Sequence, residues 1–356
     1  MKKKLSLALV IVMCAALLAG CSKGGDGGDA GESGTLNLYT WAEMFPEDVI
    51  ADFEKETGIK VNYTNFDFDE TMLAKLESTN GGDYDLVIAD DYIIETVIAE
   101  GLAQKLDKSK IENFSNINPL FQGQFYDPTD EYTAPYGAGV QTIVYDPDAV
   151  DFEINGYADL WNEALADNLA VIANYRVING MALKVLGYSY NTNDLAQIEE
   201  AGSKLYELAG NIRLIKDDNI QEDLLSGEVS AAVMYTSQVT TAKLTDPTLK
   251  VVYPTEGIGF GIMGMFIPSQ APNADNALKF INYILDSEVS AKCFEYLGYY
   301  CTTLTAEQYI ADEYKEFLTL PGEFKSEDME MIGNISAEAD EKHGEIWIEF
   351  KTRCGQ

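Results

Sequence analysis

The fold is decided by the stretch LNLYTWAEMFPEDVIADFEKETGIKVNY, residues 36–63. Its first four residues are a short apolar run, which is typical of a buried strand. Val49 and Phe53 then lie at helical spacing, and Gly58 is the residue type that commonly ends a helix. Residues 59–63 alternate between apolar and polar, as a strand does. The stretch therefore predicts a strand, a helix and a second strand in succession.

The same alternation continues along the chain. Spacing and apolar runs predict helices at 70–76 and 93–100 and strands at 86–89, 171–172 and 231–234. Strands that alternate with helices indicate a parallel sheet with helical crossovers. At 356 residues the chain exceeds the size at which single cores stop growing. We therefore expect an α/β protein with two lobes.

The composition is strongly acidic but suited to globular folding. There are 59 Asp and Glu against 24 Lys and Arg, a formal net charge of -35, while 46% of the residues are hydrophobic. Apolar content at this level supports packed cores and argues against disorder. The negative charge excludes nucleic acid as a partner, because phosphate would be repelled, and it argues against electrostatic binding to an anionic membrane surface.

The N-terminal residues resemble an export signal. Three lysines at 2–4 precede the apolar residues 5–18, which are too few to span a bilayer but fit the core of a signal peptide. The following LAGC, ending at Cys21, looks like a bacterial lipobox and implies cleavage after residue 20 and lipid on Cys21. An ordinary signal peptide with an incidental cysteine is the alternative. Residues 21–34 are rich in Gly, Asp and Ser, as flexible linkers are, so we expect an extracytoplasmic protein anchored to the cell membrane.

The sequence offers no pattern for a metal or another cofactor. Beyond Cys21 the cysteines are Cys293, Cys301 and Cys354, an odd number that permits one disulfide and one free thiol. The one histidine, His343, does not suffice for a zinc site or a Ser-His-Asp triad. The acidic runs at 67–70 and 217–218 lack the calcium-loop pattern and are interpreted as solvated faces.

Aromatic and acidic residues follow the predicted strands. In parallel α/β sheets, ligands bind beyond the carboxyl ends of the strands. Trp41 follows the first strand, Asp90, Asp91 and Tyr92 follow the third, and Tyr235 follows the strand at 231–234. Each residue alone is as compatible with core packing, and Asp90 equally fits a helix N-cap. Together they favour a binding cleft.

Several motifs, in the same order along the chain, resemble the spermidine/putrescine-binding proteins of bacterial ABC importers. They are LYTWAE (38–43), FEKETGIKV (53–61), YDLV (84–87), NFSN (113–116), PY (135–136), ADLW (158–161), GEV (227–229), ALKFINYIL (277–285) and GY (298–299). The resemblance covers about residues 35–351. It implies a two-lobed type II periplasmic-binding-protein fold that closes on its ligand by a hinge, with no catalysis and no cofactor.

The resemblance implies a site that is only partly retained. Matching positions keep an aromatic lining at Trp41, Tyr92, Tyr136, Tyr235 and Tyr299, although a family Trp is Ala138 here and a family Tyr is Met44. The positions of the recognition carboxylates are neutral, as Asn174, Val177 and Met263. Glu43 is retained, and Asp90 and Asp91 stand where hydroxyl residues are usual. The acids expected at the site therefore all lie on the N-terminal lobe.

The resemblance also divides the chain. After the signal peptide at 1–20 and the lipidated linker at 21–34 that the N-terminal residues predict, it implies an N-terminal lobe with C-terminal helices from 35–142 and 257–356, and a second lobe at 143–256. The expected function is the solute-binding subunit of an ABC importer for a polyamine, acting as a monomer with a membrane permease. Another small amine, an amino acid-like solute or a neutral organic solute is the alternative ligand class, and a secreted lipoprotein hydrolase is a remote one.

Three competing motifs are weaker. Residues 259–264 match G-x-G-x-x-G, but the following MFIP continues as a strand rather than a helix, so we interpret these glycines as a lobe crossover where backbones approach closely. Tyr299 and Tyr300 do not form a ferric site, because adjacent strand residues point in opposite directions. Arg176 is the one basic residue placed near the cleft, as either a structural partner or a ligand contact.

Overall fold

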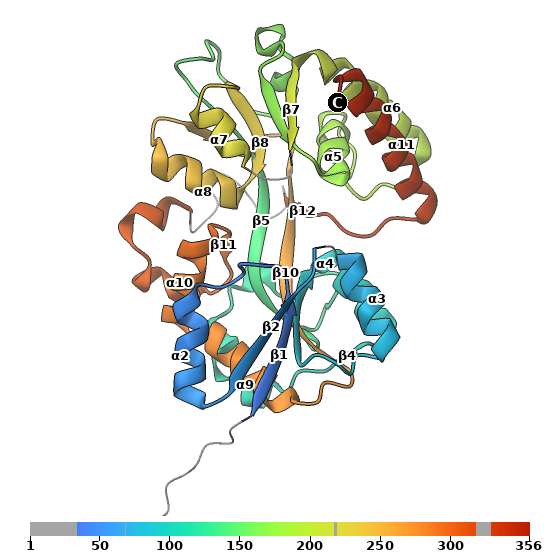
Figure 1. Ribbon diagram of the computed structural model, residues 1–356. Coiled ribbons are helices and arrows are strands. Elements are labelled where there is room, and N and C mark those ends of the chain that lie inside the picture. The colour runs from blue at the N-terminus through green and yellow to red at the C-terminus, as the bar shows by residue number, and fades with distance from the viewer. Residues whose placement is uncertain (1–33, 68, 217–218, 318–328) are drawn as a thin grey trace, which may run out of the picture.

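The computed structural model describes residues 34–67, 69–216, 219–317 and 329–356, which form two lobes joined by long strands (Figure 1). The predicted signal peptide, Cys21 and the linker up to residue 33, together with Asp217 and Asp218, lie outside the described residues. Within the described part, the strands form one sheet of twelve in the main order β2-β1-β3-β10-β5-β8-β6-β7.

The first lobe is built on the predicted β-α-β-α-β unit. Strands β1 (Thr35–Thr40), β2 (Lys60–Asn65) and β3 (Leu86–Asp90) are parallel, with β1 in the middle. Helices α2 (Glu47–Thr57) and α3 (Asp69–Thr79) connect them, and α4 (Asp91–Ala99) follows β3. Helix α2 ends where Gly58 takes a left-handed conformation at φ 70°, which glycine adopts without steric cost. The sequence prediction is confirmed for these elements.

Two long antiparallel strands carry the chain between the lobes. Strand β5 (Thr133–Tyr145) pairs with β10 (Ile258–Pro268) along residues 133–140, and then pairs with β8 along residues 141–145 (Figure 1). The predicted strand after the G-x-G-x-x-G residues is therefore confirmed. The close approaches are made by side chains rather than by backbones, because a Cβ on Gly259 would meet the Tyr190 ring at 3.0 Å and one on Gly264 would meet Ile94 at 2.7 Å.

The second lobe is a separate α/β layer. Strands β6 (Leu169–Ile172), β7 (Ile212–Lys216) and β8 (Ala231–Tyr235) are parallel, and β9 (Lys250–Val252) pairs with β5. Its helices are α5 (Tyr175–Val185), α6 (Leu195–Glu207), α7 (Ile220–Leu225) and α8 (Thr236–Thr245). Its core is one continuous cluster of buried apolar side chains, separate from the two clusters of the first lobe.

The C-terminal part is divided between the lobes. Helix α9 (Ala274–Ile284) packs on the first lobe, whereas α10 (Ser287–Leu297) places Val289 and Cys293 in a first-lobe cluster and Ala291 and Phe294 in the second-lobe cluster. Helix α11 (Ala337–Arg353) instead packs on α5 and α6 of the second lobe, with Trp347 and Phe350 in that core (Figure 1). The assignment of all of 257–356 to the N-terminal lobe is therefore wrong for α11, because its apolar face is buried by the second lobe.

The remaining elements are short. They are β4 (Ala103–Gln104), β11 (Tyr300–Cys301), β12 (Met329–Met331) and the 3₁₀ helices Lys108–Lys110, Glu112–Asn116, Pro119–Phe121, Tyr157–Trp161, Glu163–Leu165, Leu208–Asn211, Leu304–Tyr309 and Asp312–Phe317. No helix in the part of the chain that the structure describes is long and apolar enough to cross a bilayer.

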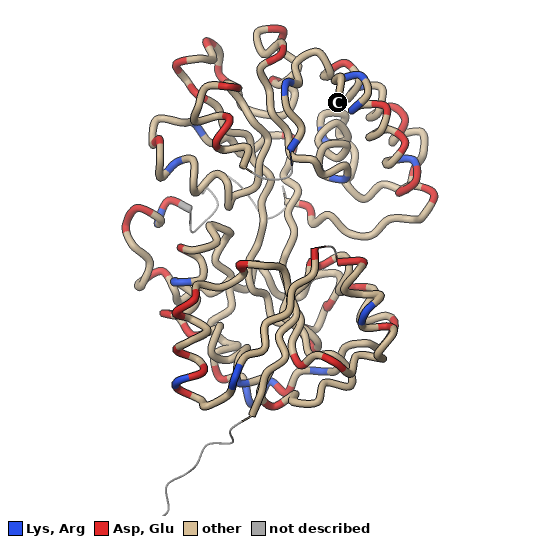
Figure 2. Tube along the Cα trace, in the orientation of Figure 1, with Lys and Arg blue, Asp and Glu red and all other residues tan. Residues whose placement is uncertain are grey.

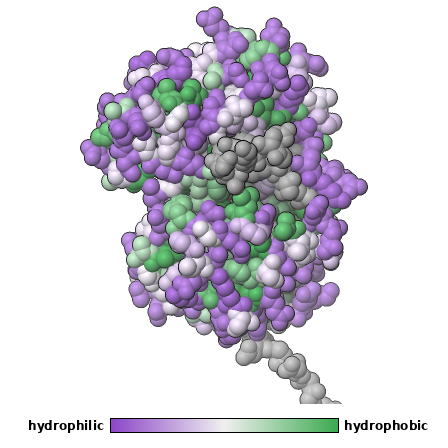
Figure 3. All heavy atoms as spheres, turned by 180° about the vertical axis from the view of Figure 1, so that it is seen from behind, coloured by the Kyte–Doolittle hydropathy of each residue, from purple (hydrophilic) through white to green (hydrophobic). Residues whose placement is uncertain are grey.

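Acidic residues are spread over the outer surface of both lobes, where they outnumber the basic ones (Figure 2). The face seen from behind is also mainly hydrophilic, with apolar atoms gathered in smaller patches (Figure 3). Most of the negative charge therefore lies on solvated surface, where it contributes to solubility.

Candidate functional site

A cavity of about 610 Å³ lies where the two lobes face each other. Its size falls within the range of small-molecule sites in proteins. The first lobe and the crossing strands contribute Glu70, Asp90, Asp91, Tyr92, Gly139, Gly259, Phe260, Gly261, Met263 and Tyr299 to its lining. The second lobe and the segment before α11 contribute Asn174, Tyr175, Arg176, Val177, Tyr235, Ile332, Gly333, Asn334, Ile335, Ala337 and Asp340.

Four acids lie together where β3 ends and α3 and α4 begin, and all of them except the buried Asp69 line the cavity. We call Asp69, Glu70, Asp90 and Asp91 the acid corner. The Asp69 carboxylate accepts from the Asp90 backbone N–H at 3.4 Å. The Tyr92 hydroxyl lies 3.2 Å from Glu70 Oε1 and 3.4 Å from Asp69 Oδ2, so it can donate to either. No ion pair to any acid of this corner is found in the described residues.

Three residues of the acid corner, Asp69, Asp90 and Asp91, have raised pKa values. Burial is the main cause for Asp69 and Asp90, and the Asp90 charge adds to it at Asp69 while the Asp91 charge adds to it at Asp90. Burial also raises the pKa of Asp91 to about 7, although its hydrogen bonds from the Ile262 and Tyr92 backbone oppose the shift. Carboxylates that are desolvated, close together and without a cation favour an added positive charge.

Asp91 has a positioning role in addition to its charge. It is 3% exposed and its carboxylate accepts from the Ile262 backbone N–H at 2.6 Å. A Cβ on Gly261 would approach Asp91 Oδ2 at 3.4 Å, so the glycine admits this contact closely. Asp91 therefore fixes β10 against the start of α4.

Asp90 is half-buried and stands at the N-cap position of α4, as one interpretation of the sequence expected. Its side chain, however, makes no capping hydrogen bond.

Aromatic rings form the walls. Tyr92, Tyr235, Tyr299 and Phe260 all line the cavity. The Asn174 side-chain amide donates to the Tyr235 hydroxyl at 3.3 Å. Rings of this kind pack along methylene chains and attract cations with their faces. The cavity therefore combines apolar walls with a strongly acidic end.

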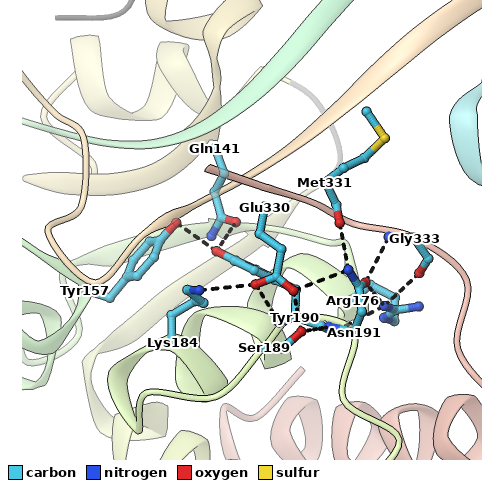
Figure 4. Close-up of polar contacts among 10 residues, drawn as sticks. All are labelled: Gln141, Tyr157, Arg176, Lys184, Ser189, Tyr190, Asn191, Glu330, Met331 and Gly333. Carbon is cyan, nitrogen blue, oxygen red and sulfur yellow. Dashed lines mark hydrogen bonds and ion pairs between the residues drawn. The ribbon is translucent and has the colours of Figure 1, made fainter. Parts of the chain in front are cut away.

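The second lobe adds one acid and one base. The Tyr175 hydroxyl donates to Asp340 Oδ1 at 2.7 Å, which holds the carboxylate of α11 beside α5. Arg176 Nη2 donates to the Tyr190 and Gly333 carbonyls and to Asn191 Oδ1 at 3.1–3.3 Å (Figure 4). All three acceptors are neutral, and burial lowers the pKa of Arg176. Arg176 thus braces the segment that leads into α11.

The structure brings together seven of the predicted site residues: Asp90, Asp91, Tyr92, Asn174, Tyr235, Met263 and Tyr299. Three others lie away from the cavity. Tyr136 is buried and donates to the Met44 carbonyl, Trp41 packs on the Phe66 ring with centroids 5.0 Å apart, and Glu43 is exposed on a turn at φ 57°.

Sequence reasoning missed three acids. The interpretation of residues 67–70 as a solvated face is wrong for Asp69, which is 5% exposed, whereas Asp67 and Glu70 are exposed as predicted and Glu70 also lines the cavity. A signal was available, because both residues follow the carboxyl end of β2 and the strand-end rule applies there too. The expectation that all site acids lie on the N-terminal lobe is wrong because Asp340 reaches the cavity from α11.

Other chemistries find no support in the described residues. Tyr300 is buried with its hydroxyl 3.0 Å from that of Tyr253, while Tyr299 faces the cavity, so the two point apart as predicted. His343 is buried in α11, and burial lowers its pKa to about 4. No group of three metal-ligating side chains occurs in the part that the structure describes, where Cys293, Cys301 and Cys354 are all free.

The chain matches known proteins over most of its length. The family model described as bacterial extracellular solute-binding protein matches residues 48–321. The spermidine/putrescine-binding periplasmic protein of Escherichia coli is 36% identical over 82% of this chain and 84% of its own length. The putrescine-binding periplasmic protein PotF of Escherichia coli is 29% identical over 81% and 83%.

The solved structures agree with this. The spermidine/putrescine ABC transporter substrate-binding protein PotD of Streptococcus pneumoniae is 31% identical, with a TM-score of 0.82 over 90% of this chain and 100% of that one. These relatives are binding proteins of transport systems and not enzymes. The chain belongs to the bacterial extracellular solute-binding proteins, with the two-lobed type II periplasmic-binding-protein fold that the sequence predicts.

Proposed function

We propose that this chain is the solute-binding subunit of an ABC importer that captures polyamines such as spermidine or putrescine. The observation that carries the proposal is the acid corner, which places three carboxylates and no basic partner at one end of an aromatic-walled cavity, with Asp69 buried next to them. The names of relatives with 36% identity support the same ligand class.

The physical fit is direct. A buried ammonium is costly unless a carboxylate compensates its charge, and the acid corner lacks such a charge of its own. The rings of Tyr92, Tyr235 and Tyr299 line the cavity, and aromatic rings can offer the apolar and cation-attracting surface that an aminoalkyl chain needs. Capture would follow from binding in the open cleft, closure of the lobes about β5 and β10, and docking of the closed form on a membrane permease.

Replacement of Asp90 by Asn tests the site. Asn keeps the shape of the side chain and removes its charge, so putrescine and spermidine should bind at least about tenfold more weakly, which is about 1.4 kcal/mol. Calorimetric titration of the purified chain measures this. Asp67→Asn is the matched control, because Asp67 is exposed, precedes α3 and does not line the cavity. Equal dissociation constants for wild type and Asp90→Asn would remove Asp90 from the site.

A thermal-shift panel tests the ligand class. A ligand at about 100 times its dissociation constant stabilises the folded chain by about 2.7 kcal/mol. Putrescine and spermidine should raise the unfolding midpoint and be recovered chemically unchanged. If another class of solute raises it and no amine does, the polyamine proposal fails and the transport role alone remains. Chemical conversion of the ligand would instead support a hydrolase.

A second ligand class is favoured by Arg176. Its Nη1 has no hydrogen-bond partner among the described residues and is not one of the buried unpaired atoms, so it remains accessible in a residue that lines the cavity. An amine that also carries a carboxylate, such as an amino acid-like solute, could use both Arg176 and the acid corner. The same titrations with 4-aminobutyrate test this class.

We also propose that the protein acts as a monomer held at the membrane by lipid on Cys21. The support is the LAGC sequence that ends at Cys21 and the Gly- and Ser-rich residues after it. Expressed in a bacterium, wild type should partition into the detergent phase and Cys21→Ala into the aqueous phase, with the acylated N-terminal peptide seen by mass spectrometry. A detergent-phase Cys21→Ala protein would contradict the anchor.

Light scattering of the released chain should give the mass of one chain, somewhat below the 39.2 kDa of the full sequence because residues 1–20 are removed.

A further inference from the structure

Asp340 stands apart from the acid corner, across the cavity. It lies in the first turn of α11, and α11 packs on α5 and α6 of the second lobe. The other residues of that lobe that sequence comparison singled out, Asn174 and Val177, are neutral. Of the cavity-lining residues, Asp340 is therefore the one carboxylate that the second lobe supplies.

One oxygen of Asp340 is held and the other is free to bind. Tyr175 donates to Oδ1 at 2.7 Å, which fixes the orientation of the carboxylate. Oδ2 accepts no hydrogen bond from any described residue and is not one of the buried unpaired atoms, so it remains accessible. The start of α11, capped by the Ser336 hydroxyl, favours a negative charge at this place.

Arg176 forms no ion pair with Asp340, although the Asp340 charge partly opposes the burial that lowers the pKa of Arg176. No described Lys or Arg lies within ion-pair distance of this carboxylate, and Arg176 Nη2 is turned toward Tyr190, Asn191 and Gly333 (Figure 4). The cavity lining has one basic residue, Arg176, and four acidic ones, Glu70, Asp90, Asp91 and Asp340. A ligand that is cationic at both ends is therefore favoured over one that presents a carboxylate to the second lobe.

We propose that Asp340 binds the second ammonium of a ligand whose first ammonium lies at the acid corner, so that the cavity selects linear diamines and triamines over monoamines. The inference rests on the proposed amine-binding function and names its specificity-determining residue on the second lobe. When the lobes close, both carboxylate sites contact the same ligand. The length of the ligand therefore determines how well it stabilises the closed state.

The test compares putrescine with n-butylamine, which has the same four carbons and one ammonium. The purified full chain should bind putrescine at least about tenfold more tightly than n-butylamine. In Asp340→Asn, putrescine should weaken by about that factor while n-butylamine changes less than about twofold, so the preference disappears. Glu338→Gln is the control, because Glu338 is exposed on the same helix and does not line the cavity.

Two further variants keep the test decisive. Tyr175→Phe removes the hydrogen bond to Asp340 but leaves its charge in place, so this variant should retain the preference for putrescine. It therefore distinguishes the effect of the Asp340 charge from the effect of the Tyr175 hydrogen bond. An unchanged unfolding midpoint confirms that Asp340→Asn is folded. If the preference survives in Asp340→Asn, or if 4-aminobutyrate binds wild type more tightly than putrescine, the inference is overturned while amine binding stands. If no amine binds wild type, the proposed function itself fails.

Discussion

At the scale of single residues, the acid corner couples amine binding to protons. Asp69, Asp90 and Asp91 have pKa values raised by burial and by one another's charge, and that of Asp91 is about 7. The empty folded chain therefore holds protons near neutral pH that the unfolded chain has already lost. Because the folded state binds more protons between about pH 4 and pH 7, the stability of the empty chain falls as pH rises through that window.

A bound ammonium favours the charged form of these carboxylates, whereas the empty cavity favours the protonated form. Binding therefore lowers their pKa values and releases protons. We expect the affinity for putrescine to rise as pH increases from about 5 to about 8, by up to about tenfold per unit for each proton released. Calorimetry in buffers of different ionisation enthalpy measures the released protons directly.

The variants give the control. Asp90→Asn should release fewer protons than wild type and show a flatter pH profile, while Asp67→Asn should match wild type. Binding that takes up protons, or an affinity that does not depend on pH in this window, would show that the acid corner does not hold the ammonium.

At the scale of elements, α11 completes the second lobe. Its residues Phe350, Ile346 and Trp347 lie in the core of that lobe, and a Cβ on Gly202 of α6 would meet Ile346 at 2.8 Å. Phe350 is fully buried, whereas Ile348 on the same helix is 66% exposed. The position of Asp340 in the cavity depends on this packing.

Phe350→Ala should therefore destabilise the chain strongly. Truncation of a fully buried Phe costs about 3–5 kcal/mol through lost apolar burial and the cavity that remains. Denaturant unfolding followed by circular dichroism measures the loss, and Ile348→Ala should change the free energy of unfolding by no more than about 0.5 kcal/mol. Equal effects from the two variants would mean that α11 is not part of the lobe core.

Elements also show where prediction from sequence works. The β1-α2-β2-α3-β3-α4 unit could be predicted because its signals are local, such as the apolar run at 86–89 and Gly58 after α2. Asp90 and Asp91 could be found because strand ends face clefts. Asp340 could not, because it is placed by packing between α11 and helices that lie more than a hundred residues earlier. Tyr136 and Trp41 pack in a first-lobe core cluster, which the sequence could not distinguish from a cleft because aromatic residues serve equally well in a core.

At the scale of the whole molecule, the segment between β12 and α11 links the two lobes. Asn334 donates to the Tyr92 carbonyl at 2.9 Å and to Glu95 Oε2 at 2.7 Å, both on α4 of the first lobe. Its neighbour Gly333 donates to Asn191 Oδ1 at 2.9 Å in the second lobe and accepts from Arg176 (Figure 4). Asn334 therefore fastens the second lobe to the first across the cavity.

Removing this link should open the empty protein. In Asn334→Ala the two hydrogen bonds to α4 are lost, so the balance between separated and apposed lobes moves toward separation. The apparent affinity for a ligand falls in proportion to the population of the competent arrangement, so putrescine should bind several-fold more weakly. Small-angle scattering should show a larger radius of gyration for the empty variant, and saturating putrescine should return it to the wild-type value.

Asn155→Ala is the control. It removes an exposed side chain of the second lobe that does not line the cavity, and it should leave both measurements unchanged. Identical scattering from empty wild type and Asn334→Ala would mean that β5, β10 and the ligand alone set the separation of the lobes.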